Sequence, residues 1–146
     1  MAVMESFFHL AWVSPCKLTK DENKFLQTEI FIRIYDELKE YFKAQHQDYF
    51  DLMKFDAQME NAIMEGNFFR CLIKDILSTE EYSLSGIAYY THSSEEVIYD
   101  VVIGLNTNPS LSLARKIIEL HRSIRPELYR AIVAKIVNEY SKSGSD

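Results

Sequence analysis

The stretch of residues 19–45 carries large apolar side chains at intervals of three and four positions along its length. This interval matches the turn of an α-helix and predicts one long helix. Thr19 stands where an N-cap is expected and Glu22 follows three residues later, which predicts a capping box. No segment has the alternating pattern of a convincing strand, although residues 7–13 fit a short strand as well as a short helix. We therefore predict an all-α fold.

The apolar side chains of this predicted helix spread over roughly half of its circumference. Phe25 and Ile32 lie outside that arc, close to each other. A helix that is apolar on more than one side can contact both its own domain and a partner subunit, and a single well-buried core helix is the alternative. With nine Phe, nine Tyr and one Trp, the chain has more large apolar surface than one small core needs. We predict a helical dimerisation segment over residues 1–66, with a homodimer contact formed by Phe25, Ile30, Phe31, Ile34, Leu38 and Phe42.

The remaining chain predicts shorter helices. Gly66 and Asn67 either end one of these helices or only bend it. The last helix begins at Pro126, which is a favourable first residue because its missing N–H has no partner there in any case. The predicted helices span residues 49–64, 68–77 and about 126–140, with a connection at 46–48 and a frayed tail at 142–146.

Charge is distributed unevenly along the sequence. The formal net charge is −6, which taken alone argues against a nucleic-acid binder. Residues 1–66 hold seven basic and twelve acidic side chains, and residues 67–104 hold two and six. Residues 105–146, in contrast, hold seven basic and four acidic side chains. We therefore expect any phosphate-facing surface to involve the last third of the chain.

The cysteines and the first residues bear on the compartment. Cys16 and Cys71 have neither a metal-type spacing nor the pattern of a disulfide framework, which fits a reducing cytoplasm. The opening segment lacks a basic region and contains Glu5 and His9, so it makes a poor signal peptide. No run approaches the roughly 20 apolar residues that a membrane span needs. We expect a cytoplasmic protein without a membrane partner.

Residues 82–104 carry the most informative pattern. Two short helices that cross around a tight turn need a small residue where they touch and apolar residues facing inward on both sides. Ala88 fills the small position, and the second helix has Ile98 and Val101 at its inward positions. Gly104 can adopt the left-handed conformation that closes a helix. The pattern predicts a helix-turn-helix.

Residues 68–121 resemble the phage-repressor/Cro-like (Xre-type) family of helix-turn-helix transcriptional regulators. The resemblance lies in the spacing of Ile87-Ala88, Ile98 and Gly104, followed by Asn108-Pro109-Ser110-Leu111 at the start of the next helix. It implies a lambda-repressor-like helix-turn-helix domain, with residues 67–141 as that domain. It also implies binding to double-stranded DNA as a homodimer whose recognition helices meet half-sites about 34 Å apart.

The predicted recognition helix is acidic. It begins Ser94-Glu95-Glu96 and continues to Tyr99 and Asp100. Glutamate can accept a hydrogen bond from the N4 amino group of cytosine, so a base-reading role is open. The alternative role is structural, because Ser93 can cap the helix with Glu96 at position N3 and early acidic residues favour the helix dipole.

DNA affinity has to come mainly from phosphate contacts, which need Lys, Arg or backbone N–H groups at helix N-termini. The family often has Gln near the start of the first motif helix, where this chain has Leu84. The turn reads Thr91-His92-Ser93 without glycine, and His tolerates positive φ. An ordinary solvated charge is an equal alternative for each basic residue. The predicted DNA contacts are Ser83, Ser85, Ser94, Glu96, Tyr99, Asn106, Thr107, Asn108, Arg115, Lys116, Arg122 and Arg125.

Enzyme chemistry has little support in the sequence. The four histidines are scattered, and the two His/Glu pairs at four-residue spacing have no third ligand nearby. Neither a phosphate-cradling glycine loop nor a nucleophile elbow is present. We expect no enzymatic activity, no metal and no cofactor. The favoured function is a dimeric DNA-binding transcriptional regulator, and the alternative is an antitoxin-like protein-interaction module that kept the fold and lost DNA affinity.

Overall fold

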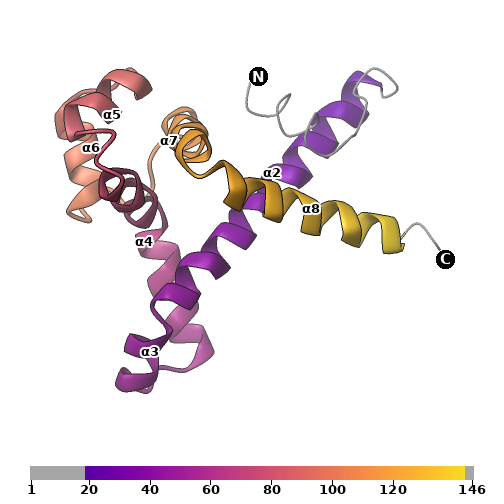
Figure 1. Cartoon of the computed structure of the whole chain (residues 1–146), viewed down its shortest axis with the longest axis horizontal. Helices are drawn as coiled ribbons and strands as arrows, with labels where there is room; N and C mark the ends of the chain where they lie inside the picture. The colour runs from indigo at the N-terminus through magenta and orange to yellow at the C-terminus, as the bar shows by residue number, and fades with distance from the viewer. Residues whose placement is uncertain (1–18, 144–146) are drawn as a thin grey trace. The chain divides into compact units, whose positions relative to one another are not determined.

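A computed structural model describes residues 19–143, which are all-helical (Figure 1). The predicted all-α class is confirmed for this range, and the undecided segment 7–13 lies outside it. No helix in the described range is long and apolar enough to cross a membrane. The seven described helices are α2 Lys20–Gln45, α3 Gln47–Met53, α4 Ala57–Ser78, α5 Leu84–Thr91, α6 Glu95–Val102, α7 Leu111–Ile124 and α8 Pro126–Ser143.

The described residues form two compact units. The first, which we call the α2–α8 unit, combines residues 19–38 with residues 126–143. The second, the central unit, holds residues 39–125 and therefore includes the last part of α2 and all of α3 to α7.

In the α2–α8 unit, two ion pairs join the two helices. Arg33 pairs with Glu139, and the Nζ atom of Lys135 lies 2.9 Å from Oε2 of Glu37. Both pairs join α2 to α8, and the two helices cross in Figure 1. The buried apolar residues of this unit are Ile30, Ile34, Leu38, Tyr129, Ile132, Val133 and Ile136.

Helix α2 has a second apolar stripe that is exposed. Phe25 and Ile32 are 72% and 53% exposed, and their seven-residue separation places them on one face. The Thr19 cap is confirmed, because the Glu22 amide donates to Thr19 Oγ1 over 3.1 Å. Among the residues predicted to form the dimer contact, Phe25 is exposed and Phe31 half-buried, whereas Ile30, Ile34, Leu38 and Phe42 are buried within the single chain.

The boundaries of α3 and α4 differ from those of the two helices predicted over residues 49–64 and 68–77. The first of these is broken at Lys54, whose φ of 57° ends α3, and Asp56 then caps α4 by accepting from the Met59 amide over 2.8 Å. Gly66 does not end a helix, and α4 runs through it without interruption. The predicted boundary at residues 66 and 67 thus lies inside α4, where buried side chains on both sides hold the helix together.

The core of the central unit is built from four helices. α4 packs against α6 and α7, and α5 packs against the same two helices. In Figure 1, α3 and α5 lie near opposite ends of α4. Phe42, from the last turns of α2, contacts the rings of Phe68 and His121 at centroid distances of 6.3 and 5.9 Å. The buried apolar side chains of α4 to α7 include Phe68, Leu72, Ile73, Ile76, Ile87, Ala88, Ile98, Val101, Leu113, Ile117, Ile118 and Leu120.

The C-terminal helix is slightly longer than expected. Pro126 is its first residue, as the sequence predicts. The helix continues through Ser143, so residues 142 and 143 of the segment expected to fray are helical. The other residues of that segment, 144–146, lie outside the described range.

Candidate nucleic-acid interface

Helices α5 and α6 are joined by the tight turn His92–Ser94. His92 has a φ of 54°, the left-handed conformation that its position requires. The amides of His92 and Ser93 donate to the carbonyls of Tyr89 and Ala88 over 3.2 and 3.0 Å. These two bonds are those of a Schellman motif, which satisfies the last carbonyls of α5 and redirects the chain into α6.

The inward-facing residues predicted for this helix pair are confirmed. Ile87, Ile98 and Val101 are at most 1% exposed, and the small residue Ala88 is 4% exposed. Thr91 is also buried, and its hydroxyl donates to the Ile87 carbonyl over 2.8 Å, so no polar group is left unpaired there. The pair is held together by apolar burial on one side of each helix.

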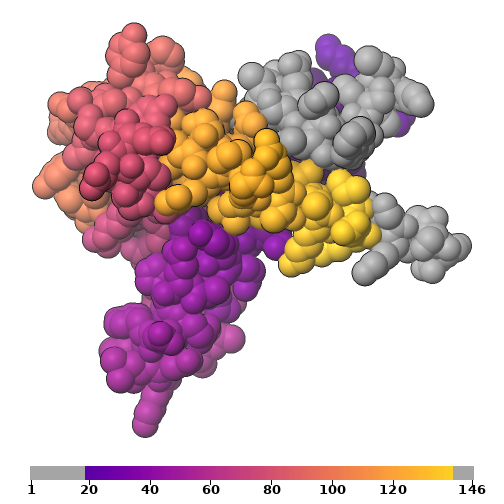
Figure 2. Space-filling model, in the orientation of Figure 1, coloured from indigo at the N-terminus to yellow at the C-terminus, as the bar shows by residue number. Residues whose placement is uncertain are grey.

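The outer face of α6 lies opposite Ile98 and Val101. Glu96, Tyr99 and Ile103 are exposed there, with exposed fractions of 51% for Tyr99 and 41% for Ile103. The side chains of Glu95 and Glu96 form no hydrogen bond or ion pair with any other residue in the described range. In Figure 2, atoms of α5 and α6 lie at the surface of the central unit.

The capping box predicted for Ser93 and Glu96 is wrong, whereas Glu95 and Glu96 do stand in the first turn of α6, where acidic side chains favour the helix dipole. Ser94, not Ser93, is the N-cap of α6, and its hydroxyl accepts from the Val97 amide over 3.3 Å. Ser93 lies one residue too early, because its amide closes α5 and its hydroxyl bonds to that of Thr91 over 2.7 Å. Val97 therefore occupies N3, and Glu96 is not part of a capping box.

Serine residues also cap the neighbouring helices α5 and α7. Ser83 caps α5 by accepting from the Gly86 amide over 3.1 Å, and Ser110 caps α7 by accepting from the Leu113 amide over 3.2 Å. The Ser85 hydroxyl lies 3.0 Å from that of Ser83. Three serine-capped N-termini, those of α5, α6 and α7, thus belong to the same unit.

The loop between α6 and α7 has a defined conformation. Gly104 has a φ of 85°, which confirms its predicted left-handed conformation. The Asn106 amide donates to the Asp100 carbonyl over 2.9 Å, and the Asn106 side chain accepts from the Asn108 amide over 3.2 Å. Thr107 and Asn108 are exposed. Their side chains are therefore available at the surface, whereas the Asn106 oxygen is used within the loop.

Two of the basic residues predicted to contact phosphates, Lys116 and Arg125, are engaged within the unit. Lys116 Nζ donates to the Thr91 carbonyl over 3.3 Å, at the C-terminus of α5, where a cation also favours the helix dipole. Arg125 forms two hydrogen bonds with the Asp75 carboxylate. Arg115 and Arg122 are half-buried on α7 and make further interactions of their own.

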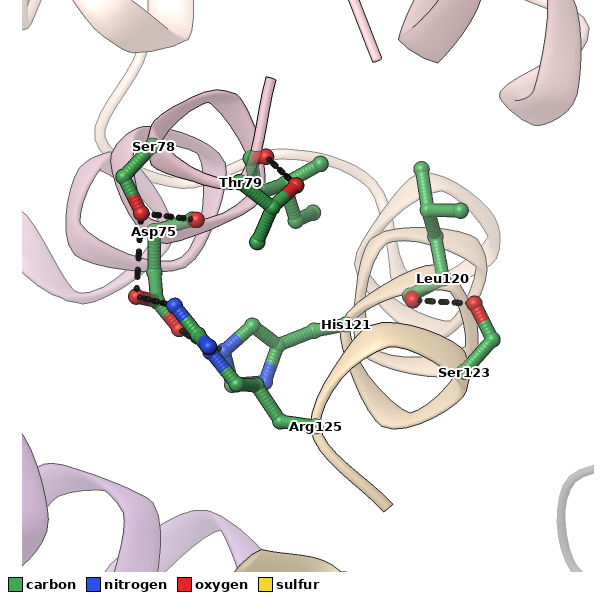
Figure 3. Close-up of polar contacts among 8 residues, drawn as sticks. Asp75, Ser78, Thr79, Leu120, His121, Ser123 and Arg125 are labelled. Atoms are coloured by element: carbon green, nitrogen blue, oxygen red, sulfur yellow. Dashed lines mark hydrogen bonds and ion pairs between the residues drawn. The ribbon is translucent and has the colours of Figure 1, made fainter. Parts of the chain in front are cut away.

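Asp75, His121 and Arg125 form a polar cluster between α4 and the end of α7 (Figure 3). His121 Nε2 lies 2.7 Å from Asp75 Oδ2, and Arg125 Nε and Nη2 lie 3.1 and 3.0 Å from the two carboxylate oxygens. The His121 side chain is completely buried, whereas that of Arg125 is 39% exposed. Asp75 was not predicted from the sequence, because it lies 46 and 50 residues from its partners.

Burial and pairing have opposite effects on the pKa values of His121 and Asp75 in this cluster. Burial lowers the pKa of His121 and outweighs the raising effect of Asp75, so the imidazole is neutral near pH 7 and donates Nε2–H to the carboxylate. Burial by itself would raise the pKa of Asp75, but the hydrogen bonds and charges of Arg125 and His121 together lower it. The carboxylate is therefore ionised, and the cluster is a hydrogen-bonded ion pair that ties α7 to α4.

Several large apolar side chains are exposed near α6. Tyr89 on α5 is 86% exposed. Leu105, in the loop between α6 and α7, is 77% exposed, and Leu111 at the start of α7 is 60% exposed. Glu95 and Glu96 on α6 are exposed as well. No group of three or more His, Cys, Asp or Glu side chains that could hold a metal ion occurs between residues 19 and 143.

Comparisons with family models, with curated proteins and with solved structures found no match for this chain.

Proposed function

We propose that the central unit is a helix-turn-helix domain that binds double-stranded DNA through α6, and that the chain is a dimeric transcriptional regulator. The observation that carries the proposal is the placement of α6. One side of this eight-residue helix is buried on α4 and α5, and the opposite side exposes Glu96, Tyr99 and Ile103. An α-helix of about 10–12 Å diameter fits the major groove, which is about 12 Å wide.

Phosphate binding in this proposal depends largely on neutral donors. Ser85, Thr107 and Asn108 are exposed, and serine caps define the N-termini of α5 and α7 beside them in sequence. Neutral hydroxyl and amide groups contact phosphates in many complexes and orient the protein on the duplex. Because Lys116 and Arg125 are already paired within the unit, we expect few released counterions and a shallow dependence of affinity on salt.

The first test introduces a negative charge at the centre of the outer face of α6. We expect Tyr99→Glu to weaken binding to genomic DNA fragments at least tenfold, because the added carboxylate would enter a groove lined by phosphates. Binding is measured by fluorescence anisotropy at about 50 mM salt, where phosphate contacts remain effective. Tyr49→Glu is the matched control, since Tyr49 on α3 is also 51% exposed, as Tyr99 is.

The control variant should bind DNA as the unchanged chain does. Equal binding by both variants and the unchanged chain would exclude α6 from the interface. If the unchanged chain retains no fragment at about 50 mM salt, the proposed function is wrong.

For the dimer, the exposed stripe Phe25 and Ile32 on α2 is the contact that we propose. Replacing both residues with Asp places two charges on this stripe, so we expect a twofold fall in mass measured by light scattering at micromolar concentration. The unchanged chain should have twice the chain mass of 17.1 kDa. Leu52→Asp is the control, because Leu52 on α3 is 78% exposed and lies outside the proposed contact. A single-chain mass for the unchanged protein would contradict the dimer.

A second function is favoured by one observation, the exposed apolar and acidic side chains within residues 89–111. Tyr89, Leu105 and Leu111 are large apolar side chains that are exposed, and Glu95 and Glu96 repel phosphate. These features fit a module that binds another protein. The two functions differ in the first experiment, because such a module would retain no DNA at low salt.

A further inference from the structure

The outer face of α6 lacks the side chains that most often recognise bases. Bidentate recognition of guanine uses Arg or Lys, and bidentate recognition of adenine uses Asn or Gln. The helix reads Glu-Glu-Val-Ile-Tyr-Asp-Val-Val over residues 95–102 and contains none of these four residue types. Apart from the Tyr99 hydroxyl, the exposed polar groups of this face are acceptors. Its side chains therefore cannot supply the usual donors to guanine.

Glu96 is the acceptor best placed to meet a base edge. Ile98 and Val101 are buried, so Glu96 and Tyr99 lie on the side of α6 that points away from the core. Because Ser94 caps the helix through the Val97 amide, the Glu96 carboxylate is not used in capping. It also has no ion-pair partner among residues 19–143.

On the basis of the proposed DNA binding, we propose that Glu96 selects cytosine in the recognised sequence. In the major groove, guanine presents two acceptors and thymine presents an acceptor beside a methyl group. Adenine presents its amino donor next to the N7 acceptor, which repels a carboxylate. Cytosine alone presents the N4 amino donor without an adjacent acceptor on the same base. A carboxylate in the groove thus discriminates in favour of cytosine at the position that it faces.

The test begins with the full chain and a pool of random duplex DNA at low salt. The selected sequence is then changed one base pair at a time, and the Kd of each duplex is measured for the unchanged chain and three variants. We expect the unchanged chain to lose about tenfold in affinity when the cytosine facing Glu96 is replaced. For Glu96→Ala we expect this difference to disappear, because the hydrogen bond to cytosine is lost and affinity for the other sequences rises when a charge that repels phosphate is removed. For Glu96→Gln we expect the preferred base to become adenine.

Glu95→Ala is the matched control. It removes the same charge one residue earlier, so we expect higher affinity for every sequence with the cytosine preference retained. Circular dichroism melting of each variant verifies that α6 still folds. If DNA is selected but Glu96→Ala keeps the base preference of the unchanged chain, this inference is overturned and the proposed function stands. If no DNA is selected, both are overturned.

Discussion

Leu72→Ala should lower the free energy of unfolding by about 3 kcal/mol, the largest effect that we expect from a single truncation of this type. Leu72 is completely buried in the second half of α4, between Phe68 and Ile76, which are also buried one turn away on either side. This side of α4 belongs to the core shared with α6 and α7. The variant loses the transfer free energy of the removed atoms and leaves a cavity that a close-packed core fills only partly.

The matched control for this prediction is Leu52→Ala. Leu52 on α3 is 78% exposed, so the same truncation removes little buried surface and should cost less than about 0.5 kcal/mol. Both values come from urea unfolding followed by circular dichroism, with the slope of the transition compared between variants. Similar losses for the two leucines would contradict the placement of α4 at the centre of the unit.

Asp75→Asn is expected to lower the free energy of unfolding by about 2–3 kcal/mol at pH 7. The variant removes the only carboxylate that pairs with both His121 and Arg125 in Figure 3. An amide keeps one acceptor oxygen but turns its NH₂ group toward a donor, so one partner loses its hydrogen bond. Because the Arg125 side chain is 39% exposed and remains hydrated, we place the loss below that of a fully buried ion pair. Asp51→Asn, at an exposed position of α3, should change stability by less than about 0.5 kcal/mol.

The Asp75, His121 and Arg125 cluster also determines whether the stability of the fold rises or falls with pH. The pKa of His121 is lowered by burial, so on acidification the unfolded chain takes up a proton near pH 6.5 while the folded chain does not. The unfolded state then binds more protons, and stability falls as the pH decreases below about 6.5, by at most about 1.4 kcal/mol per pH unit for one group. The lowered pKa of Asp75 adds a further loss at more acidic pH, as its carboxylate protonates.

Subtracting the stability profile of His121→Gln from that of the unchanged chain isolates the histidine contribution. This contribution should be constant above pH 7 and decrease toward pH 5. If it instead increased on acidification, His121 would be charged in the folded chain, and the description of the cluster as a neutral imidazole beside an ion pair would be wrong.

Local features of this fold could be predicted from the sequence because their physical causes are local. Thr19 caps α2 by accepting a hydrogen bond from an amide three residues away. Gly104, which follows α6, has a left-handed φ that glycine adopts without a steric penalty. Ala88 was predicted at the α5–α6 contact because only a small side chain allows two helices to approach closely there. Each of these predictions depends on residues within a few positions of one another.

Other features depended on competition between nearly equivalent residues. Ser93 and Ser94 are both suitable N-caps, and the Schellman motif at His92 engages the Ser93 amide, which leaves Ser94 to cap α6. Gly66 weakens a helix by about 1 kcal/mol relative to alanine. Burial of Met64 and Phe68 on either side outweighs this cost, so α4 continues through it. Sequence patterns alone do not rank such alternatives, because the deciding free energies come from packing.

The long helix predicted over residues 19–45 was determined by the sequence itself, since the 3.6-residue turn translates the spacing of apolar residues directly into a helix face. Only the tertiary structure decided which apolar stripe of α2 is buried and which basic side chains form ion pairs. Ile34 is buried while Ile32 is exposed, and Arg125 pairs with Asp75, 50 residues away in the chain. Burial and ion pairing depend on what surrounds a side chain in space, and that neighbourhood exists only once distant helices have packed.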